Sequence, residues 1–272
     1  MNIREWGKLM KIGFIGGGNM AGAIALGVIK SGLCEKCDVC VCDINEESLK
    51  KYDKEIKTST DNKKALESDY IILAVKPFIL SKVLEELSSY DIKNKVFVSI
   101  AAGITTDEIK KILGKDTKVV RVMPNTPAQV AEGMTVIAQP DSCVTESELL
   151  SVVSIFNAVG KTEIMAENMI NVVTGVSGSS PAYVFMLIEA MADAGVSGGI
   201  PRDKAYTLAA QSVLGSAKMV LETGMHPGEL KDMVCSPKGT TIEAVAELER
   251  RGFRAAIIEA IKKCIDKANN IK

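Results

Sequence analysis

The stretch GFIGGGNMA, residues 13–21, decides the fold of this chain. It joins an apolar run at 11–15, which is typical of a buried strand, to a helical pattern at 20–30. In this turn the glycines match G-x-G-x-x-A, whose backbone N–H groups and helix dipole bind a pyrophosphate. A glycine-rich turn without a ligand is the alternative, because a lone glycine pattern is weak evidence. The strand-to-helix context favours a dinucleotide site.

Outward from this turn, the N-terminal half alternates strand-like runs with helical patterns. The expected strands are 11–15, 38–42, 70–75, 95–101 and 118–123, with weaker candidates at 136–138 and 162–165. The expected helices are 20–30, 63–67, 80–88, 106–113 and 146–157. The early strands have no polar face, as in a parallel sheet that helices cover on both sides. The pattern predicts an α/β fold with an N-terminal Rossmann-like doubly wound sheet.

After about residue 166 the strand-like runs disappear and helical spacing takes over. Ser180 is predicted to cap a helix with Pro181 at its first position, and further helices are expected at 202–221, 241–250 and 254–268. We predict a dinucleotide-binding domain at 1–165 and an all-helical domain at 166–272. These helices are too few for an independent bundle, so we favour burial against a second copy over packing on the first domain alone.

Composition excludes several classes of protein. The 272 residues have a formal net charge of −1, and 25% are charged. A charge near zero argues against a nucleic-acid partner, which needs clustered Lys and Arg. No apolar run approaches the roughly 20 residues of a membrane span, and the first residues lack the apolar core of a secretory signal. We therefore expect a small-molecule ligand and no membrane.

Histidine and cysteine counts limit the chemistry further. The one histidine, His226, rules out a His-rich metal site and disfavours a Ser-His-Asp triad. Cys34 and Cys37, two of seven cysteines, have the spacing of metal ligands. Cys40 and Cys42 alternate in an apolar run, which favours buried core thiols instead. Unpaired thiols are typical of a reducing compartment, so we expect a cytoplasmic protein without a bound metal.

The residues that follow the expected strands indicate one crevice. Asp43 ends the second strand, where an acid accepts hydrogen bonds from ribose hydroxyls and repels a 2′-phosphate, which favours NADH. A helix N-cap in DIN, residues 43–45, is the alternative. The next strands lead into AVKP at 74–77, SIAAG at 99–103 and RVMPNTP at 121–127. Ligands of open α/β sheets bind beyond the carboxyl ends of strands, so these segments are expected to line the same site.

From residue 11 onward the chain resembles the pyrroline-5-carboxylate reductase family. Five motifs in order carry the resemblance: GFIGGGNMA at 13–21, AVKP at 74–77, RVMPNTP at 121–127, GSSPAY at 178–183 and SPKGTT at 236–241. It implies reduction of the imine of L-1-pyrroline-5-carboxylate to L-proline with NADPH or NADH, the last step of proline biosynthesis. It also implies a Rossmann domain and a helical domain that dimerises through interlocking helices, with decamers in some members.

Matched motif by motif, the resemblance also implies site residues. The cofactor contacts would be Gly16, Gly17, Gly18, Asn19, Met20, Ala21, Asp43, Asn62, Ala74, Val75, Lys76, Pro77, Ala101 and Ala102. The substrate carboxylate would sit on Gly239, Thr240 and Thr241, and the Thr241 hydroxyl would donate a proton to the imine nitrogen. Glu167 would contact the substrate.

Two positions depart from the family pattern. Ser180 and Lys238 stand where the family usually has glycine. Lys238 is the more consequential change, because glycine reaches a positive φ cheaply and lysine does not. Its ammonium would also add a cation beside the substrate carboxylate.

Two other functions fit parts of the sequence. A β-hydroxyacid dehydrogenase-like reductase shares the first turn and a helical second domain, but it needs a catalytic lysine in the helical half. Lys204 and Lys218 look like ordinary surface charges of a helix. A nucleotide-sensing protein without turnover is the other alternative. Consumption of NADH with pyrroline-5-carboxylate would separate the three.

Overall fold

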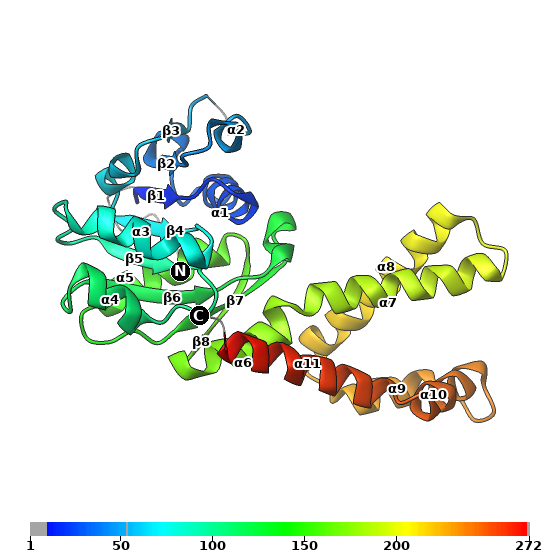
Figure 1. The fold of residues 1–272 in the computed structure, drawn as a ribbon. Helices are drawn as coiled ribbons and strands as arrows, with labels where there is room; N and C mark the ends of the chain where they lie inside the picture. The colour runs from blue at the N-terminus through cyan, green and yellow to red at the C-terminus, as the bar shows by residue number, and fades with distance from the viewer. Residues whose placement is uncertain (1–9, 53, 271–272) are drawn as a thin grey trace. The chain divides into compact units, whose positions relative to one another are not determined.

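The structure is a computed structural model that describes residues 10–52 and 54–270. The chain divides into two compact units (Figure 1). Unit 1 comprises Met1–Gly178 with Ile265–Lys272, and unit 2 comprises Ser179–Cys264. The predicted domain limit after residue 165 follows the last strand, whereas the compact units divide later, after Gly178. The limits 1–165 and 166–272 stay a prediction.

Unit 1 is built on an eight-stranded sheet in the order β3-β2-β1-β4-β5-β6-β7-β8. The strands are β1 (Ile12–Ile15), β2 (Val39–Cys42), β3 (Lys57–Ser59), β4 (Tyr70–Leu73), β5 (Val96–Ser99), β6 (Lys118–Met123), β7 (Gly133–Ala138) and β8 (Gly160–Met165). Among the described residues, β6 and β7 pair antiparallel and the other neighbours pair parallel. This confirms the Rossmann-like sheet; the edge strand β3 was not predicted.

Helices cover both faces of the sheet. The α-helices of unit 1 are α1 (Asn19–Lys30), α2 (Glu46–Leu49), α3 (Pro77–Ser88), α4 (Thr106–Leu113), α5 (Glu146–Asn157) and α6 (Ile170–Val173). The 3-10 helices are η2 (Lys36–Asp38), η3 (Asn62–Glu67), η4 (Thr126–Val130) and η5 (Glu167–Met169), and η6 (Thr174–Gly178) is a π-helix. Apolar residues of α1 and α5 pack in one core cluster, and those of α3 and α4 in another. Two buried faces explain strands without a polar side.

Unit 2 is helical, as predicted. It holds α7 (Ser180–Ser197), α8 (Arg202–Thr223), α9 (Pro227–Val234), α10 (Thr240–Arg250) and most of α11 (Phe253–Asn269). The predicted cap at Ser180 is wrong: the N-cap is Ser179, without a side-chain cap bond. The π-helix η6 ends at Gly178, and Ser179, which has αR backbone angles, joins it to α7. Within the described residues, no helix is long and apolar enough to cross a membrane.

Candidate active site

The glycine turn lies between β1 and α1, against the ends of the two neighbouring strands. Gly16 donates its N–H to the Cys42 carbonyl at 2.7 Å and has a φ of +101°. A Cβ on Gly16 would lie 2.6 Å from the Ala74 carbonyl oxygen. Only glycine meets both conditions, because a side chain would be strained and would collide with the backbone after β4.

Asp43 holds the second glycine of the turn. Its Oδ2 accepts the Gly17 N–H at 2.7 Å, and its Oδ1 accepts the Asn45 N–H at 2.8 Å. The alternative, a helix N-cap in residues 43–45, is confirmed at Asn45, which caps α2 by accepting the Glu47 N–H. Tyr52 donates to the Gly17 carbonyl at 3.2 Å, and burial raises its pKa, so the hydroxyl keeps its proton. The turn is thereby fixed from two sides.

The start of α1 is left open by these bonds. Gly18 is the N-cap and has no side-chain cap bond, and the first turn holds no acidic residue. The N–H groups of Asn19, Met20 and Ala21 belong to the first helical turn, which has no partners inside the helix. Such N–H groups and the positive end of the helix dipole fit an anionic pyrophosphate. The residues present therefore fit a bound dinucleotide.

Strand register brings the other predicted cofactor residues to the same edge. Ile15 lies beside Cys42 and Leu73, and Leu73 beside Ser99. The segments that follow these strands therefore begin side by side. They hold the predicted contacts Gly16, Asp43, Ala74, Val75, Lys76, Pro77, Ala101 and Ala102.

Lys76 and Asn62, two of the predicted cofactor contacts, differ in their exposure to solvent. Lys76 is the exposed N-cap of α3, so its ammonium reaches solvent at this edge. Asn62 is buried at the start of η3 and donates its amide N–H to Glu86 at 3.1 Å. Its predicted contact with a cofactor stays a prediction, and the structure adds a role in joining η3 to α3.

Glu167 has partners that the sequence did not predict. One carboxylate oxygen accepts from the Thr106 N–H at 2.8 Å, and the other from the Thr106 hydroxyl at 2.5 Å. Arg121 approaches the same carboxylate at 3.5 Å and is only 3% exposed. The predicted substrate contact of Glu167 stays a prediction. The sequence signal for this contact was Arg121 inside an apolar strand, because a buried charge needs a partner.

In unit 2, SPKGTT forms a turn that opens α10. The Gly239 N–H donates to the Ser236 carbonyl at 3.0 Å, and Pro237 and Lys238 lie between them. Lys238 has a φ of +58°, the left-handed region that favours glycine. Gly239 is the N-cap without a side-chain cap bond, so Thr240 and Thr241 form an open first helical turn. Free N–H groups and two hydroxyls are suited to a carboxylate.

His226, which precedes Pro227, has a structural role as a helix cap. Its Nδ1 accepts the Gly228 N–H at 3.0 Å and so caps α9. Helix α9 itself was not predicted.

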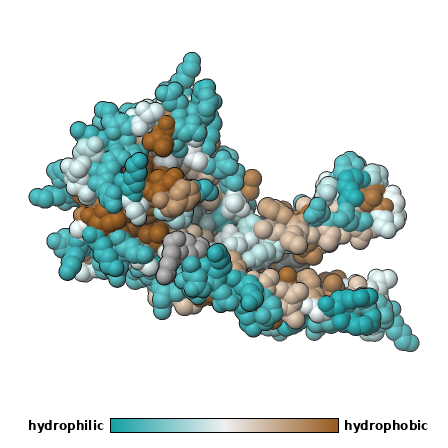
Figure 2. All heavy atoms as spheres, in the orientation of Figure 1, coloured by the Kyte–Doolittle hydropathy of each residue, from teal (hydrophilic) through white to brown (hydrophobic). Residues whose placement is uncertain are grey.

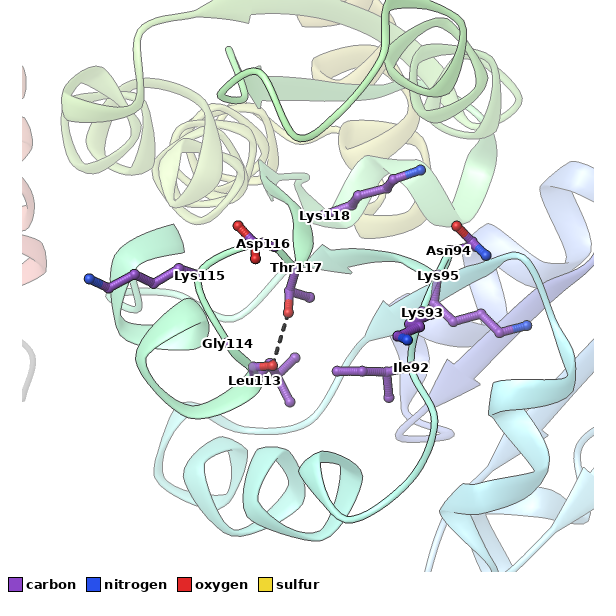
Figure 3. Close-up of a pocket in the computed structure, with 10 residues that line it drawn as sticks. All are labelled: Ile92, Lys93, Asn94, Lys95, Leu113, Gly114, Lys115, Asp116, Thr117 and Lys118. Atoms are coloured by element: carbon purple, nitrogen blue, oxygen red, sulfur yellow. Dashed lines mark hydrogen bonds between the residues drawn. The ribbon is translucent and has the colours of Figure 1, made fainter.

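A hollow of about 420 Å³ lies at the opposite edge of the sheet, before β5 and β6 (Figure 3). Lysines surround it, but Lys95 donates to the Ser68 carbonyl and Lys118 pairs with Glu148 at 2.6 Å. Figure 3 shows the Lys95, Lys115 and Lys118 side chains directed away from the hollow. It lies before the strands β5 and β6, whereas the dinucleotide edge follows the ends of the strands.

Comparisons with known proteins cover almost the whole chain. A family model described as pyrroline-5-carboxylate reductase dimerisation matches residues 167–271. Another, described as NADP oxidoreductase, coenzyme F420-dependent, matches residues 11–103. The pyrroline-5-carboxylate reductase of Escherichia coli (strain K12) is 52% identical over 264 residues, which cover 96% of this chain and 98% of the relative.

Solved structures agree with these matches. The structure of a pyrroline-5-carboxylate reductase from Coxiella burnetii superposes with a TM-score of 0.88 at 35% identity and covers 96% of this chain and 98% of that one. The Plasmodium falciparum pyrroline carboxylate reductase with NADP bound gives a TM-score of 0.87 at 30% identity, covering 96% and 97% of the two chains.

Proposed function

The chain belongs to the pyrroline-5-carboxylate reductase family, and we propose that it reduces L-1-pyrroline-5-carboxylate to L-proline with NAD(P)H, the last step of proline biosynthesis. The observation that carries the proposal is the 52% identity with a reductase of that name over 96% of the chain. The open start of α1 and the SPKGTT turn supply the two binding surfaces that the reaction requires.

In this proposal unit 1 holds the dinucleotide. The N–H groups at the start of α1 bind the pyrophosphate, and the segments after β2, β4 and β5 contact the rest of the cofactor. NAD(P)H, when bound, supplies the hydride that reduces the imine. Asp43 is one residue beyond β2, where its carboxylate repels a 2′-phosphate. Lys50 pairs with Glu47, so its charge is already partly neutralised. Both features favour NADH.

Unit 2 holds the substrate through the start of α10. The N–H groups of Gly239, Thr240 and Thr241 bind the carboxylate, and the Thr241 hydroxyl donates a hydrogen bond to the imine nitrogen. This bond needs the nitrogen lone pair, so it forms with the neutral imine, or with the neutral amine that remains after hydride addition to an imine that arrived protonated. A hydroxyl donor therefore suffices and no strong acid is needed. The cation of Lys238 adds attraction for the carboxylate.

The test is a steady-state assay with purified chain and pyrroline-5-carboxylate, following absorbance of the reduced nicotinamide and quantifying proline. We expect one proline per cofactor oxidised, with a higher kcat/KM for NADH than for NADPH. Cofactor binding without oxidation would contradict the proposed reaction and favour a nucleotide sensor. Oxidation of 3-hydroxy acids with NAD⁺ in place of imine reduction would favour a β-hydroxyacid dehydrogenase.

A homo-oligomer follows from the dimerisation-domain match at residues 167–271, and we infer that the dimer is its basic form. Large apolar side chains of unit 2 are exposed, including Phe185, Met186 and Leu208. Figure 2 shows apolar surface on the helices of this unit. Burial of such groups drives association. Light scattering of the wild type and of Phe185→Asp tests this, with Gln129→Asp in unit 1 as control. The same measurement distinguishes a dimer from a decamer.

A cytoplasmic location is also part of the proposal. Each of the seven cysteines is a free thiol, which fits a reducing compartment. Fractionation of cells that express the chain tests this location.

A further inference from the structure

Two large apolar side chains are exposed at the carboxyl edge of the sheet in unit 1. Phe78 is 85% exposed and Ile44 is 79% exposed, the highest values among the large apolar residues that the structure describes. Ile44 lies two residues after β2, and Phe78 lies in the first turn of α3, which follows β4. Single exposed apolar residues are common on protein surfaces. These two, however, follow the strands on either side of β1, whose glycine turn is the proposed dinucleotide site.

The backbone on both sides of Ile44 is fixed by side-chain bonds. Asp43 accepts the Asn45 N–H at 2.8 Å, and Asn45 accepts the Glu47 N–H at 3.1 Å. The polar side chains next to Ile44 are therefore bonded to the local backbone, whereas the Ile44 side chain lies in solvent. A segment that is already rigid loses little conformational entropy when a ligand covers its apolar side chain.

The backbone around Phe78 is fixed as well. Pro77 occupies the first position of α3, where its ring fixes φ. The Ile79 N–H donates to the Lys76 carbonyl at 2.9 Å and closes the turn that contains Phe78. The aromatic ring is thus exposed on a rigid helix start. Aromatic rings of this kind stack on nucleobases, because every base has an apolar face.

The distance between the two segments fits one flat ring. Ile15 of β1 lies beside Cys42 of β2 on one side and Leu73 of β4 on the other. The ends of β2 and β4 are therefore two strand spacings apart, about 9.5 Å. A planar base with atoms in contact at about 3.5–4 Å on each face needs roughly 7–8 Å. One base therefore fits between side chains that extend from the segments after these strands.

We propose that Ile44 and Phe78 bind the two faces of the adenine ring of the cofactor. The inference rests on the proposed function, in which the pyrophosphate binds the start of α1 and the Asp43 carboxylate faces the adenosine ribose. Adenine is attached to that ribose, so it lies next to the residue that follows Asp43. The contact covers only the base, which NADH and NADPH share. Ile44 and Phe78 therefore contribute affinity for both cofactors, and Asp43 sets the choice between them.

The experiment measures Kd by isothermal titration calorimetry for NADH and for ADP-ribose, which has the adenosine and the pyrophosphate but no nicotinamide. We expect Phe78→Ala to raise both Kd values about tenfold, within the range for loss of one ring stacked on a base. Ile44→Ala should raise them about threefold, because less apolar area is lost. Phe78→Trp should keep an affinity near that of wild type, because it restores an aromatic ring.

Leu150→Ala is the matched control, since it truncates another exposed apolar side chain of unit 1. Leu150 is 53% exposed on α5, two residues from Glu148, which pairs with Lys118 at the opposite edge of the sheet. Reduced nicotinamide mononucleotide, which lacks adenosine, supplies a second comparison. Its kcat/KM with pyrroline-5-carboxylate should be the same in Phe78→Ala and wild type, whereas the kcat/KM for NADH falls.

An ADP-ribose Kd within twofold of wild type in both Phe78→Ala and Ile44→Ala would overturn the proposal, as would an equal rise in Leu150→Ala. An unchanged Kd together with a changed mass in light scattering would assign Phe78 to an interface between copies of the chain instead. A wild-type chain that binds NADH without reducing pyrroline-5-carboxylate would overturn the proposed function alone, because the ADP-ribose titrations need no turnover.

Discussion

The Asp43 carboxylate accepts the backbone N–H of Gly17 at 2.7 Å, across 26 positions of sequence. One side chain at the end of β2 therefore fixes the glycine turn that follows β1. The same charge stands where an adenosine ribose is expected in folds of this kind. Asp43 thus combines a structural role in the turn with a proposed role in the choice of cofactor.

Asp43→Asn separates these two roles. The amide oxygen still accepts the Gly17 N–H, while the bond from the Asn45 N–H and the negative charge are lost. We expect the kcat/KM ratio of NADPH to NADH to rise about tenfold, because a charge near the 2′-phosphate costs on the order of 1 kcal/mol under screening. Kinetics with both cofactors measure the ratio. An unchanged ratio would show that the carboxylate does not face the ribose.

Thr241→Ala tests the proposed hydrogen bond to the imine nitrogen. We expect kcat to fall about a hundredfold, within the range for a lost positioned donor, while the Kd for NADH stays the same. Thr241→Ser should recover most of the turnover, because it restores the hydroxyl. Thr207→Ala is the control, since the exposed Thr207 hydroxyl donates to the Asp203 carbonyl within α8. Wild-type turnover in Thr241→Ala would remove the residue from the mechanism.

Sequence patterns predicted the elements whose signals are local. The helices predicted at 106–113 and 146–157 match α4 and α5, because a Thr-x-x-Glu capping box opens each one. The strands without a polar face were also predicted, because a continuous apolar run is visible in the local sequence. The strand β3 and the helix α2 were missed, since three or four residues are too few to show a period.

The errors at the site arose from contacts between distant residues. Ser180 carries a cap signature, but the π-helix before it continues the helical path. Glu167 bonds Thr106 across 61 positions, a partner that no local pattern indicates. The bond from Asp43 to Gly17 is equally non-local. Motifs therefore predicted which segments form the site, while the partners of each side chain required the fold.

Acid should destabilise unit 1 through its capping boxes. The Thr105 N–H bonds Glu108 at 2.7 Å, and this bond and the Thr105 hydroxyl hold the pKa of Glu108 below its ordinary value of 4.5. A lowered pKa gives stability that is present above the unfolded value and lost as the pH falls through the folded one. We expect Glu108→Gln to be less stable than wild type at pH 7, by about 0.5–1 kcal/mol for a weakened cap, and the difference to shrink as the pH falls below 4.5.

Urea unfolding followed by circular dichroism across this pH range measures that difference. The exposed Glu85 on α3 supplies the control, as Glu85→Gln should leave the pH profile unchanged. A stability difference between Glu108→Gln and wild type that does not shrink as the pH falls would contradict a charge-dependent cap.

Lys238 offers the last test, because its φ of +58° places a side chain where glycine is favoured. In the left-handed region a non-glycine residue costs roughly 1 kcal/mol. We expect Lys238→Gly to raise the stability of unit 2 by about 0.5–1 kcal/mol. It should also raise the KM for pyrroline-5-carboxylate, because the cation is lost. Lys238→Ala is the matched control, since it removes the same charge but keeps the Cβ and its strain. Equal stability of the Gly and Ala variants would show that the turn relaxes without strain, and equal KM values in all three chains would remove the cation from substrate binding.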